Sequence, residues 1–183
     1  MAKKILFITG SIRQKSFNRQ LAAKISSLIG DRAETSQLEY ADIPYMNQDA
    51  EFPEPEAIAR VRKAVSEADG VWICTPEYNA AVPGVLKNLL DWLSRPLVLN
   101  DPERRTAISG KKAAICGAGG NNQTKDSRAA LKSVLEFMSV EVIGDTGTGI
   151  ALTPNEWASD ELHLSDENTA LLEKQIDLFL SNL

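Results

Sequence analysis

The sequence predicts a doubly wound α/β domain, in which helices cover both faces of a five-stranded parallel sheet. Short apolar runs alternate with longer segments of helical periodicity along all 183 residues. The short runs are almost continuously apolar, which is typical of strands buried on both faces of a parallel sheet. Right-handed crossovers and a chain of this length favour the strand order 2-1-3-4-5, and we expect residues 1–183 to form a single domain.

The first half of the chain supplies three expected strands and two helices. Residues 4–9 read KILFIT and end at a glycine, and apolar residues at helical spacing predict a helix over 18–29. Residues 34–40 predict a shorter, more polar strand, and residues 44–55 contain three prolines and predict a loop. Pro55 is expected to open the second helix, and the third strand at 71–75 stops at Pro76.

The second half continues the alternation. Pro83 suits the first turn of a helix over 83–94, and residues 112–116 predict the fourth strand, followed by a glycine-rich loop from 117 to 120. Apolar spacing marks a helix around Leu131 and Leu135, and residues 141–152 are expected to hold the fifth strand, interrupted by glycines. Ser165 is a good N-cap for a last helix, whose expected apolar stripe includes Leu171 and Leu172.

Charge and composition exclude several classes of partner. Lys and Arg total 20 and Asp and Glu total 25, a net charge of −5, and no long basic run offsets this balance. Nucleic acid and anionic membrane surfaces are therefore not expected as partners. No segment approaches the roughly 20 apolar residues of a membrane-spanning helix, and the apolar run after Lys4 is too short for a signal peptide. We expect a cytoplasmic protein.

Composition also limits the chemistry that side chains can perform. One histidine and two cysteines cannot build a Cys/His zinc cluster, so no metal is expected. His163 lies in a polar stretch and is interpreted as a solvated loop residue. Cys74 and Cys116 end neighbouring strands, and we interpret them as small buried hydrophobes, although a redox pair is conceivable. Trp157, in an expected loop, is the tryptophan that could reach a ligand.

The loop after the first strand is a candidate anion site. It joins a strand to a helix N-terminus, where free N–H groups and the helix dipole attract negative charge. Ser11, Ser16 and Asn18 add polar side chains and Arg13 adds a cation. The Walker and G-x-G-x-x-G patterns are absent, so a phosphate monoester is a better ligand than ATP or a dinucleotide. The alternative is that Ser16 or Asn18 caps the helix and Arg13 is merely solvated.

The loop after the third strand is a second candidate. In a sheet of this order the ligand crevice lies outside the carboxyl ends of the strands, between the first and third. Pro76, Glu77, Tyr78 and Asn79 would form a rigid connection there, with exposed amides that could line a flat heteroaromatic ring. The alternative is an ordinary tight loop, with Tyr78 covering the edge of the core.

These motifs, Gly10-Ser11-x-Arg13-x-x-Ser16-x-Asn18 and Pro76-Glu77-Tyr78-Asn79, are followed by Pro83-Gly84. In this the chain resembles the NAD(P)H-dependent FMN reductases of flavodoxin-like fold, which include quinone, chromate and azo reductases. The resemblance covers nearly the whole chain. It implies that the FMN phosphate is held by Ser11, Arg13, Ser16, Phe17 and Asn18. It also implies that the flavin ring runs along Pro76, Glu77, Tyr78 and Asn79, with Gly117 and Gly119 in the loop on its other side.

The resemblance further implies an activity and an assembly. FMN would accept a hydride from NADPH or NADH and pass electrons by a ping-pong mechanism to a small-molecule acceptor, such as free flavin, a quinone, an azo compound or a metal oxyanion. The cofactor carries such chemistry, so no catalytic side chain is required. Family members form homodimers or homotetramers, and the helix over 83–94 would contribute to the contact.

One departure and one alternative stand beside this interpretation. The family often has a serine after the fourth strand, whereas here Asn122 or Gln123 would supply the polar contact. Arg95, Arg104 and Arg105, with lysines nearby, could meet NADPH phosphates, or form a solvated or inter-subunit face. The alternative function is an FMN-binding electron carrier or redox-sensing interaction protein without NAD(P)H turnover. Against it, the phosphate loop of this chain is not of the flavodoxin type.

Overall fold

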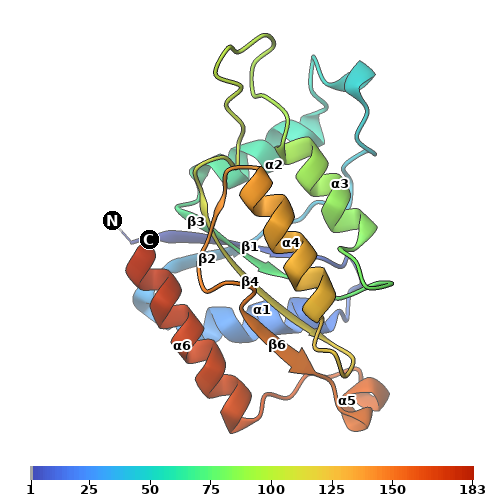
Figure 1. Ribbon diagram of the computed structural model, residues 1–183, viewed down its shortest axis with the longest axis vertical. Helices are drawn as coiled ribbons and strands as arrows, with labels where there is room; N and C mark the ends of the chain where they lie inside the picture. The colour runs from blue at the N-terminus through green and yellow to red at the C-terminus, as the bar shows by residue number, and fades with distance from the viewer. Residues whose placement is uncertain (1) are drawn as a thin grey trace.

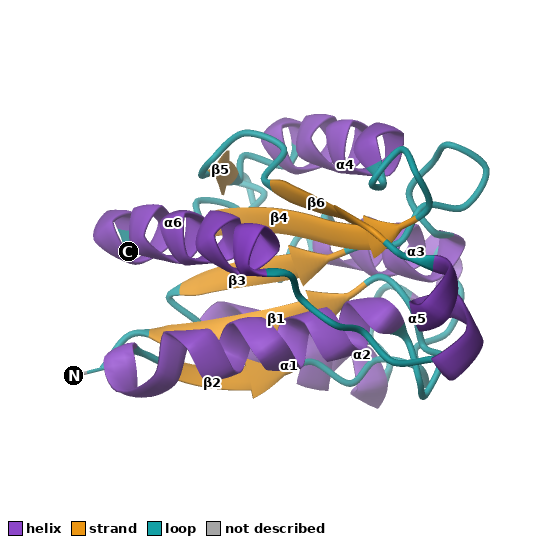
Figure 2. Cartoon of the chain, turned by 90° about the horizontal axis from the view of Figure 1, so that it is seen from below, coloured by secondary structure: helices purple, strands orange, loops and turns teal. Residues whose placement is uncertain are grey.

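The middle layer of the molecule is a parallel sheet, with helices on both sides (Figure 1, Figure 2). The computed structural model describes residues 2–183. The strands are β1 (Lys4–Thr9), β2 (Glu34–Gln37), β3 (Gly70–Cys74), β4 (Lys112–Gly119), β5 (Glu141–Val142) and β6 (Thr148–Ala151). The α-helices are α1 (Phe17–Ile29), α2 (Glu56–Glu67), α3 (Gly84–Leu93), α4 (Lys125–Phe137), α5 (Pro154–Ser159) and α6 (Asp166–Asn182).

The strand order confirms the predicted fold class. Neighbouring strands follow the order β2-β1-β3-β4-β5, with β6 also pairing with β4, and every pairing is parallel. Thr9 on β1 lies opposite Cys74 on β3, and Cys74 lies opposite Cys116 on β4. Because this register aligns the carboxyl ends of β1 and β3 beside β4, the loops that follow these strands meet at one edge of the sheet.

Two apolar layers, one on each face of the sheet, hold the helices in place. Helices α2, α3 and α4 cover one face, and α1 and α6 cover the other (Figure 2). Residues of β1 alternate between the layers, since Leu6 and Ile8 belong to the first and Ile5 and Phe7 to the second. Trp72 is wholly buried and packs its ring against Phe7 and Phe179. Burial on both faces explains the continuously apolar strands.

The fifth strand is divided, which corrects the prediction of one strand over 141–152. The short β5 pairs with the start of β4 and β6 pairs with its end. Between them the chain bulges away at Gly144 and Gly147, whose φ angles are +80° and +64°. A Cβ at Gly147 would collide with the carbonyl oxygen of Ile115, so this position needs a glycine both for its φ angle and for space.

The end of β4 corrects a second prediction. Gly117 and Gly119 were expected in a loop, but β4 continues to Gly119 because β6 pairs with it from Cys116 onward. The loop after β4 is therefore residues 120–124.

Two smaller corrections concern α6 and α5. Leu171 is 44% exposed and does not belong to the apolar stripe of α6, and Trp157 lies on α5 and not in a loop. The sequence Thr153-Pro-Asn-Glu156 is a capping box that could have predicted this helix.

No helix within residues 2–183 is both long and apolar enough to cross a membrane.

Candidate functional site

The loop after β1 folds into a compact turn at the N-terminus of α1. Ser16 is the N-cap, since its Oγ accepts a hydrogen bond from the N–H of Asn18 at 3.2 Å. The Ser16 N–H donates to the carbonyl of Arg13 at 3.1 Å, and the Oγ of Ser11 accepts from the Arg13 N–H at 3.3 Å. Both serines are buried and Arg13 is exposed. The loop therefore presents a helix N-terminus with a cation beside it.

Asn18 joins this loop to the neighbouring strand rather than pointing outward. Its Nδ2 donates to the carbonyl of Ala118 and its Oδ1 accepts from the Ala118 N–H, both at 2.9 Å. Strand β3 ends at Cys74 while β4 continues to Gly119, so the Asn18 amide completes the edge of β4 beyond β3. The side chain is 2% exposed. Its hydrogen-bonding capacity is thus engaged in fixing α1 against β4.

The loop after β3 presents Tyr78 on a rigid two-residue turn. Tyr78 and Ala81 exchange backbone hydrogen bonds, with the Ala81 N–H donating at 3.1 Å and the Tyr78 N–H at 3.4 Å. The residues between them, Asn79 and Ala80, have φ angles of 55° and 57°, as the tight turns of hairpins require. Pro76 is buried beneath the turn, whereas the Tyr78 ring is 51% exposed.

Glu77 connects the loop after β3 with the loop after β4. Its carboxylate accepts hydrogen bonds from Nδ2 of Asn122 and from the N–H groups of Asp126 and Ser127, the last two at 3.0 Å. Burial acts to raise the pKa of Glu77, but the hydrogen bonds from Ser127, Asn122 and Asp126 outweigh it and lower the pKa below its ordinary value. The carboxylate also complements the dipole of α4.

The glycines at the end of β4 make room for Thr124. A Cβ at Gly117 would collide with Oγ1 of Thr124 and the carbonyl oxygen of Thr75, and a Cβ at Gly119 would lie 2.7 Å from Cγ2 of Thr124. Thr124 is wholly buried in a left-handed conformation, and its Oγ1 has no hydrogen-bond partner among residues 2–183. A buried hydroxyl without a partner carries a desolvation cost that a ligand could relieve.

The two cysteines lie side by side in the core beneath these loops. Their Sγ atoms are 3.3 Å apart, and the indole N–H of Trp72 donates to Sγ of Cys116 at 3.2 Å. Burial raises the pKa of the Cys74 thiol well above its ordinary value, and the contact with Cys116 raises it further. Both side chains are wholly buried free thiols, which agrees with their interpretation as small hydrophobes.

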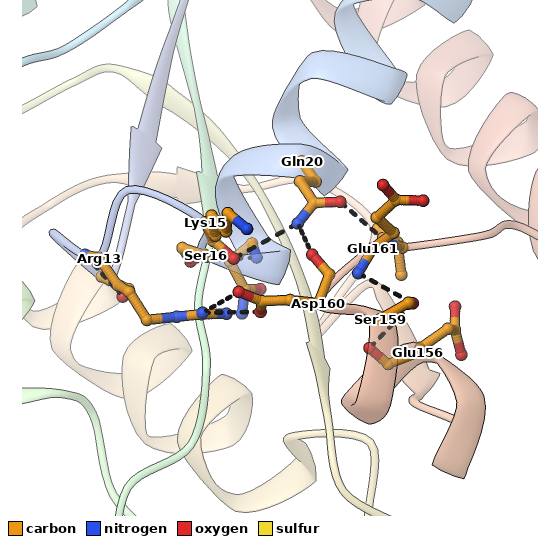
Figure 3. A network of polar contacts seen from close by, with 11 residues as sticks. Arg13, Lys15, Ser16, Gln20, Glu156, Ser159, Asp160 and Glu161 are labelled. Atoms are coloured by element: carbon orange, nitrogen blue, oxygen red, sulfur yellow. Dashed lines mark hydrogen bonds and ion pairs between the residues drawn. The ribbon is translucent and has the colours of Figure 1, made fainter.

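Residues 153–163, here called the strap, cover the loop after β1 from the side of α5 (Figure 3). Asp160 accepts two hydrogen bonds from Nη1 of Arg13, at 2.7 and 2.9 Å. The Trp157 ring meets Phe17 edge-on at 5.2 Å, and the Arg13 guanidinium lies 5.4 Å from the Phe17 ring centre. Sequence reasoning noted Trp157 but considered Asp160 only as a partner of His163, because Arg13 and Asp160 are 147 positions apart in the chain.

Other polar residues singled out in the sequence lie elsewhere. His163 is exposed, and within residues 2–183 its backbone N–H alone makes a hydrogen bond, donating to Oε1 of Glu156 at 2.8 Å. Of the basic residues, Arg95 and Arg104 line one pocket together with Glu51 and Asp101. Arg95 pairs with Glu51, Arg105 pairs with Asp101, and the nearby lysines lie at the opposite end of β4 from the candidate loops.

Taken together, the fold and this edge of the sheet define a flavodoxin-like α/β protein, in which the loop after β1 leads into the capped N-terminus of α1. The chain belongs to the NADPH-dependent FMN reductase family, whose family model matches residues 3–151. It is therefore a flavoprotein oxidoreductase of the FMN or quinone reductase type. This confirms the resemblance inferred from the motifs.

Three comparisons illustrate the relationship. An NAD(P)H-dependent FMN reductase of Pseudomonas aeruginosa is 34% identical over 178 residues, which is 94% of this chain and 91% of the relative. A quinone reductase of Pseudomonas putida is 31% identical over 97% of this chain and 92% of its own length. The solved structure of a flavoenzyme NAD(P)H:(acceptor) oxidoreductase from Paracoccus denitrificans has a TM-score of 0.85 and 27% identity, covering 98% of this chain and 96% of that one.

Proposed function

We propose that this enzyme binds FMN at the carboxyl edge of the sheet and uses it to transfer electrons from NADPH or NADH to a small-molecule acceptor by a ping-pong mechanism. The observation that carries the proposal is the convergence of three features at one edge. These are the capped N-terminus of α1 beside Arg13, the rigid turn presenting Tyr78, and the glycine-lined end of β4. All three belong to the part of the chain that the family model matches.

The residues present fit the phosphate of FMN. The first turn of α1 and the loop before it supply N–H donors and the positive end of the helix dipole. Arg13 adds a guanidinium of which only Nη1 is hydrogen-bonded to a described residue. Ser11, Ser16 and Phe17 hold the loop in place. Since the Asn18 amide is occupied by Ala118, its proposed part in phosphate binding is to position the loop.

The residues of the second loop fit a flat ring system. Pro76, Glu77, Tyr78 and Asn79 are held by the tight turn and by the Glu77 contacts to α4. The main-chain groups of Tyr78 are used within the turn and the Pro76 carbonyl accepts from Oγ1 of Thr75, so the main-chain atoms of Glu77 and Asn79 offer the fixed donors and acceptors. On the other side, Thr124 packs against the end of β4, with its unpartnered hydroxyl at Gly117 and its methyl group at Gly119. Nδ2 of Asn122 donates to the carboxylate of Glu77, which gives the polar residue after β4 a role in positioning the loop after β3.

When bound, FMN would supply the redox chemistry: it would accept a hydride from the donor and pass the electrons to a second substrate. The chain's own contribution is to hold the ring, exclude water from one of its faces and leave the other open. We propose that no side chain at this edge serves as an acid, base or nucleophile, in keeping with the buried Cys74 thiol and the position of His163 on the strap. The open side at the exposed Tyr78 would admit donor and acceptor in turn.

We propose a quinone as the acceptor class, since several relatives are named quinone reductases. We also propose a homodimer or homotetramer. The face of α3 and α4 offers a contact surface, because Phe137 at the end of α4 is 91% exposed beside a groove of about 310 Å³ lined by both helices. The free thiols Cys74 and Cys116 support a reducing, cytoplasmic compartment.

Flavin reduction tests the proposal directly. The purified protein is incubated with FMN, freed of excess, and mixed without oxygen first with NADPH or NADH and then with a benzoquinone. We expect retained flavin absorbance that bleaches much faster than free FMN and returns on adding the quinone. Retention without accelerated bleaching would indicate an electron carrier, and no retention would overturn the proposal.

A pair of variants ties this activity to the site. We expect Arg13→Ala to raise the dissociation constant for FMN by about tenfold or more, because a charge-assisted contact to phosphate is lost. The matched control is His163→Ala, whose side chain makes no hydrogen bond among the described residues. Equal effects of the two substitutions in a flavin titration would contradict the assigned phosphate site.

A further inference from the structure

The strap is a rigid unit closed by one carboxylate. Glu156 accepts from the backbone N–H of Thr153 at 2.7 Å and from the backbone N–H of His163 at 2.8 Å, so it joins the two ends of the strap. Thr153 and Glu156 also form a capping box at the start of α5. Burial opposes ionisation, yet these hydrogen bonds lower the pKa of Glu156 below its ordinary value, and the closing carboxylate is charged at neutral pH.

Gln20 of α1 then fixes the strap over the phosphate loop. Its Nε2 donates to the backbone carbonyl of Asp160 at 3.0 Å, and its Oε1 accepts from the N–H of Leu162 at 2.8 Å. Leu162 is buried, and the Asp160 N–H donates to the carbonyl of Glu156 at 2.9 Å. The backbone of Asp160 is therefore held independently of its side chain, in a left-handed conformation with φ of 60°.

The fixed carboxylate of Asp160 faces the cation proposed to bind phosphate. Nη1 of Arg13 contacts both carboxylate oxygens, while Nε and Nη2 make no hydrogen bond to any described residue (Figure 3). The Arg13 side chain is 49% exposed and that of Asp160 is 30% exposed. A flavin phosphate that reached the remaining donors of Arg13 would share the guanidinium with a carboxylate whose backbone the strap holds in place.

We propose that Asp160 sets the affinity and selectivity of the site for phosphorylated flavin, by competing with the flavin phosphate for Arg13. The inference rests on the proposed function. It assigns a part in ligand selection to the strap, which begins beyond residue 151, where the family match ends. Asp160 acts through Arg13 and is a tuning residue, not a catalytic one. The consequence is weaker discrimination between FMN and riboflavin than the loop and Arg13 alone would give.

The test compares apo-protein titrated with FMN and with riboflavin, followed by quenching of flavin fluorescence. We expect Asp160→Asn to tighten FMN binding about three- to tenfold at low salt, as suits removal of one partly exposed charge. Riboflavin binding should change by less than about twofold. The FMN effect should shrink as ionic strength rises, because salt screens partly exposed charges. Asparagine tolerates the left-handed backbone, so the variant keeps the strap geometry.

A matched control and a double variant separate competition from other effects. Glu161→Gln removes the same charge one residue away, and its side chain makes no hydrogen bond among the described residues. We expect it to leave the ratio of FMN to riboflavin affinity unchanged. In an Arg13→Ala background, Asp160→Asn should lose most of its effect on that ratio, because the shared guanidinium is absent.

Four outcomes would overturn the inference. Weaker FMN binding in Asp160→Asn would mean that Asp160 orients Arg13 toward phosphate instead of competing with it. An equal change in affinity for both flavins, or the same change in Glu161→Gln, would mean that the effect comes from the net charge of the protein or from a change in its structure, and not from competition for Arg13. Failure of the wild-type protein to bind either flavin would overturn the proposed function and this inference together. The wild-type titration alone reveals that failure, whereas failure of this inference alone appears only in the variants.

Discussion

The contact between Asn18 and Ala118 is the clearest place to test how the site is held together. Asn18→Ala removes both side-chain hydrogen bonds to the Ala118 backbone, in a place where the side chain is 2% exposed. The Ala118 N–H and carbonyl then lose their partners at the end of β4. Leaving a buried backbone group unpaired costs roughly 1–3 kcal/mol, and the better helix propensity of alanine returns about 0.5 kcal/mol.

The expected loss is therefore about 3 kcal/mol in the free energy of unfolding. For a chain of this length, this corresponds to a fall in Tm of about 6–12 °C. The measurement is urea unfolding of the apo-protein, followed by far-UV circular dichroism and by tryptophan fluorescence, so that coincident transitions support a two-state analysis.

A matched control is available in α6. Asn168 also lies in the first turn of a helix, but its side chain makes no hydrogen bond to a described residue. We expect Asn168→Ala to change the free energy of unfolding by less than about 0.5 kcal/mol. A loss below about 0.5 kcal/mol in Asn18→Ala as well would refute the reasoning, because it would mean that Ala118 finds other partners at no cost.

Three further predictions concern the loops and the core. Glu77→Gln should lower Tm at pH 7 by about 2–5 °C, since the N-terminus of α4 loses an anion. Because the folded pKa of Glu77 is lowered, its contribution is complete above the unfolded pKa and vanishes on acidification, so melts of the two proteins should converge toward pH 3. Gly119→Ala should cost about 1–3 kcal/mol through its clash with Cγ2 of Thr124, and combining it with Thr124→Ser should remove most of that loss in urea unfolding. A cost that persists in the double variant would contradict this contact. Cys74 and Cys116 should react with a thiol reagent only after unfolding, measured by absorbance of the released chromophore, and rapid reaction of the native protein would show that the pair is accessible.

Much of the architecture could be predicted from local patterns. The continuous apolar strands reflect burial on both faces and predicted a parallel sheet, and the handedness of crossovers with the chain length favoured the observed order 2-1-3-4-5. The errors lie where a distant segment decided the local structure. Gly117 reads as a loop residue, yet it lies in β4 because Gly149 of β6 pairs with it. Pairing between β6 and β4 depends on the bulge between β5 and β6, which no local periodicity indicates.

By itself, the sequence determined the order of the strands, the loops that follow them and the family to which the chain belongs. The elements and the family follow from patterns within a few residues: alternation, helical spacing, and the Gly-Ser-x-Arg and Pro-Glu-Tyr-Asn motifs. The strand order follows from the number of alternations and the handedness of crossovers. Only the tertiary structure decided which polar groups satisfy one another. Asn18 is engaged by Ala118, Glu77 by the start of α4, and Arg13 by Asp160. The physical reason is that each of these contacts depends on the register of the sheet and the packing of helices upon it.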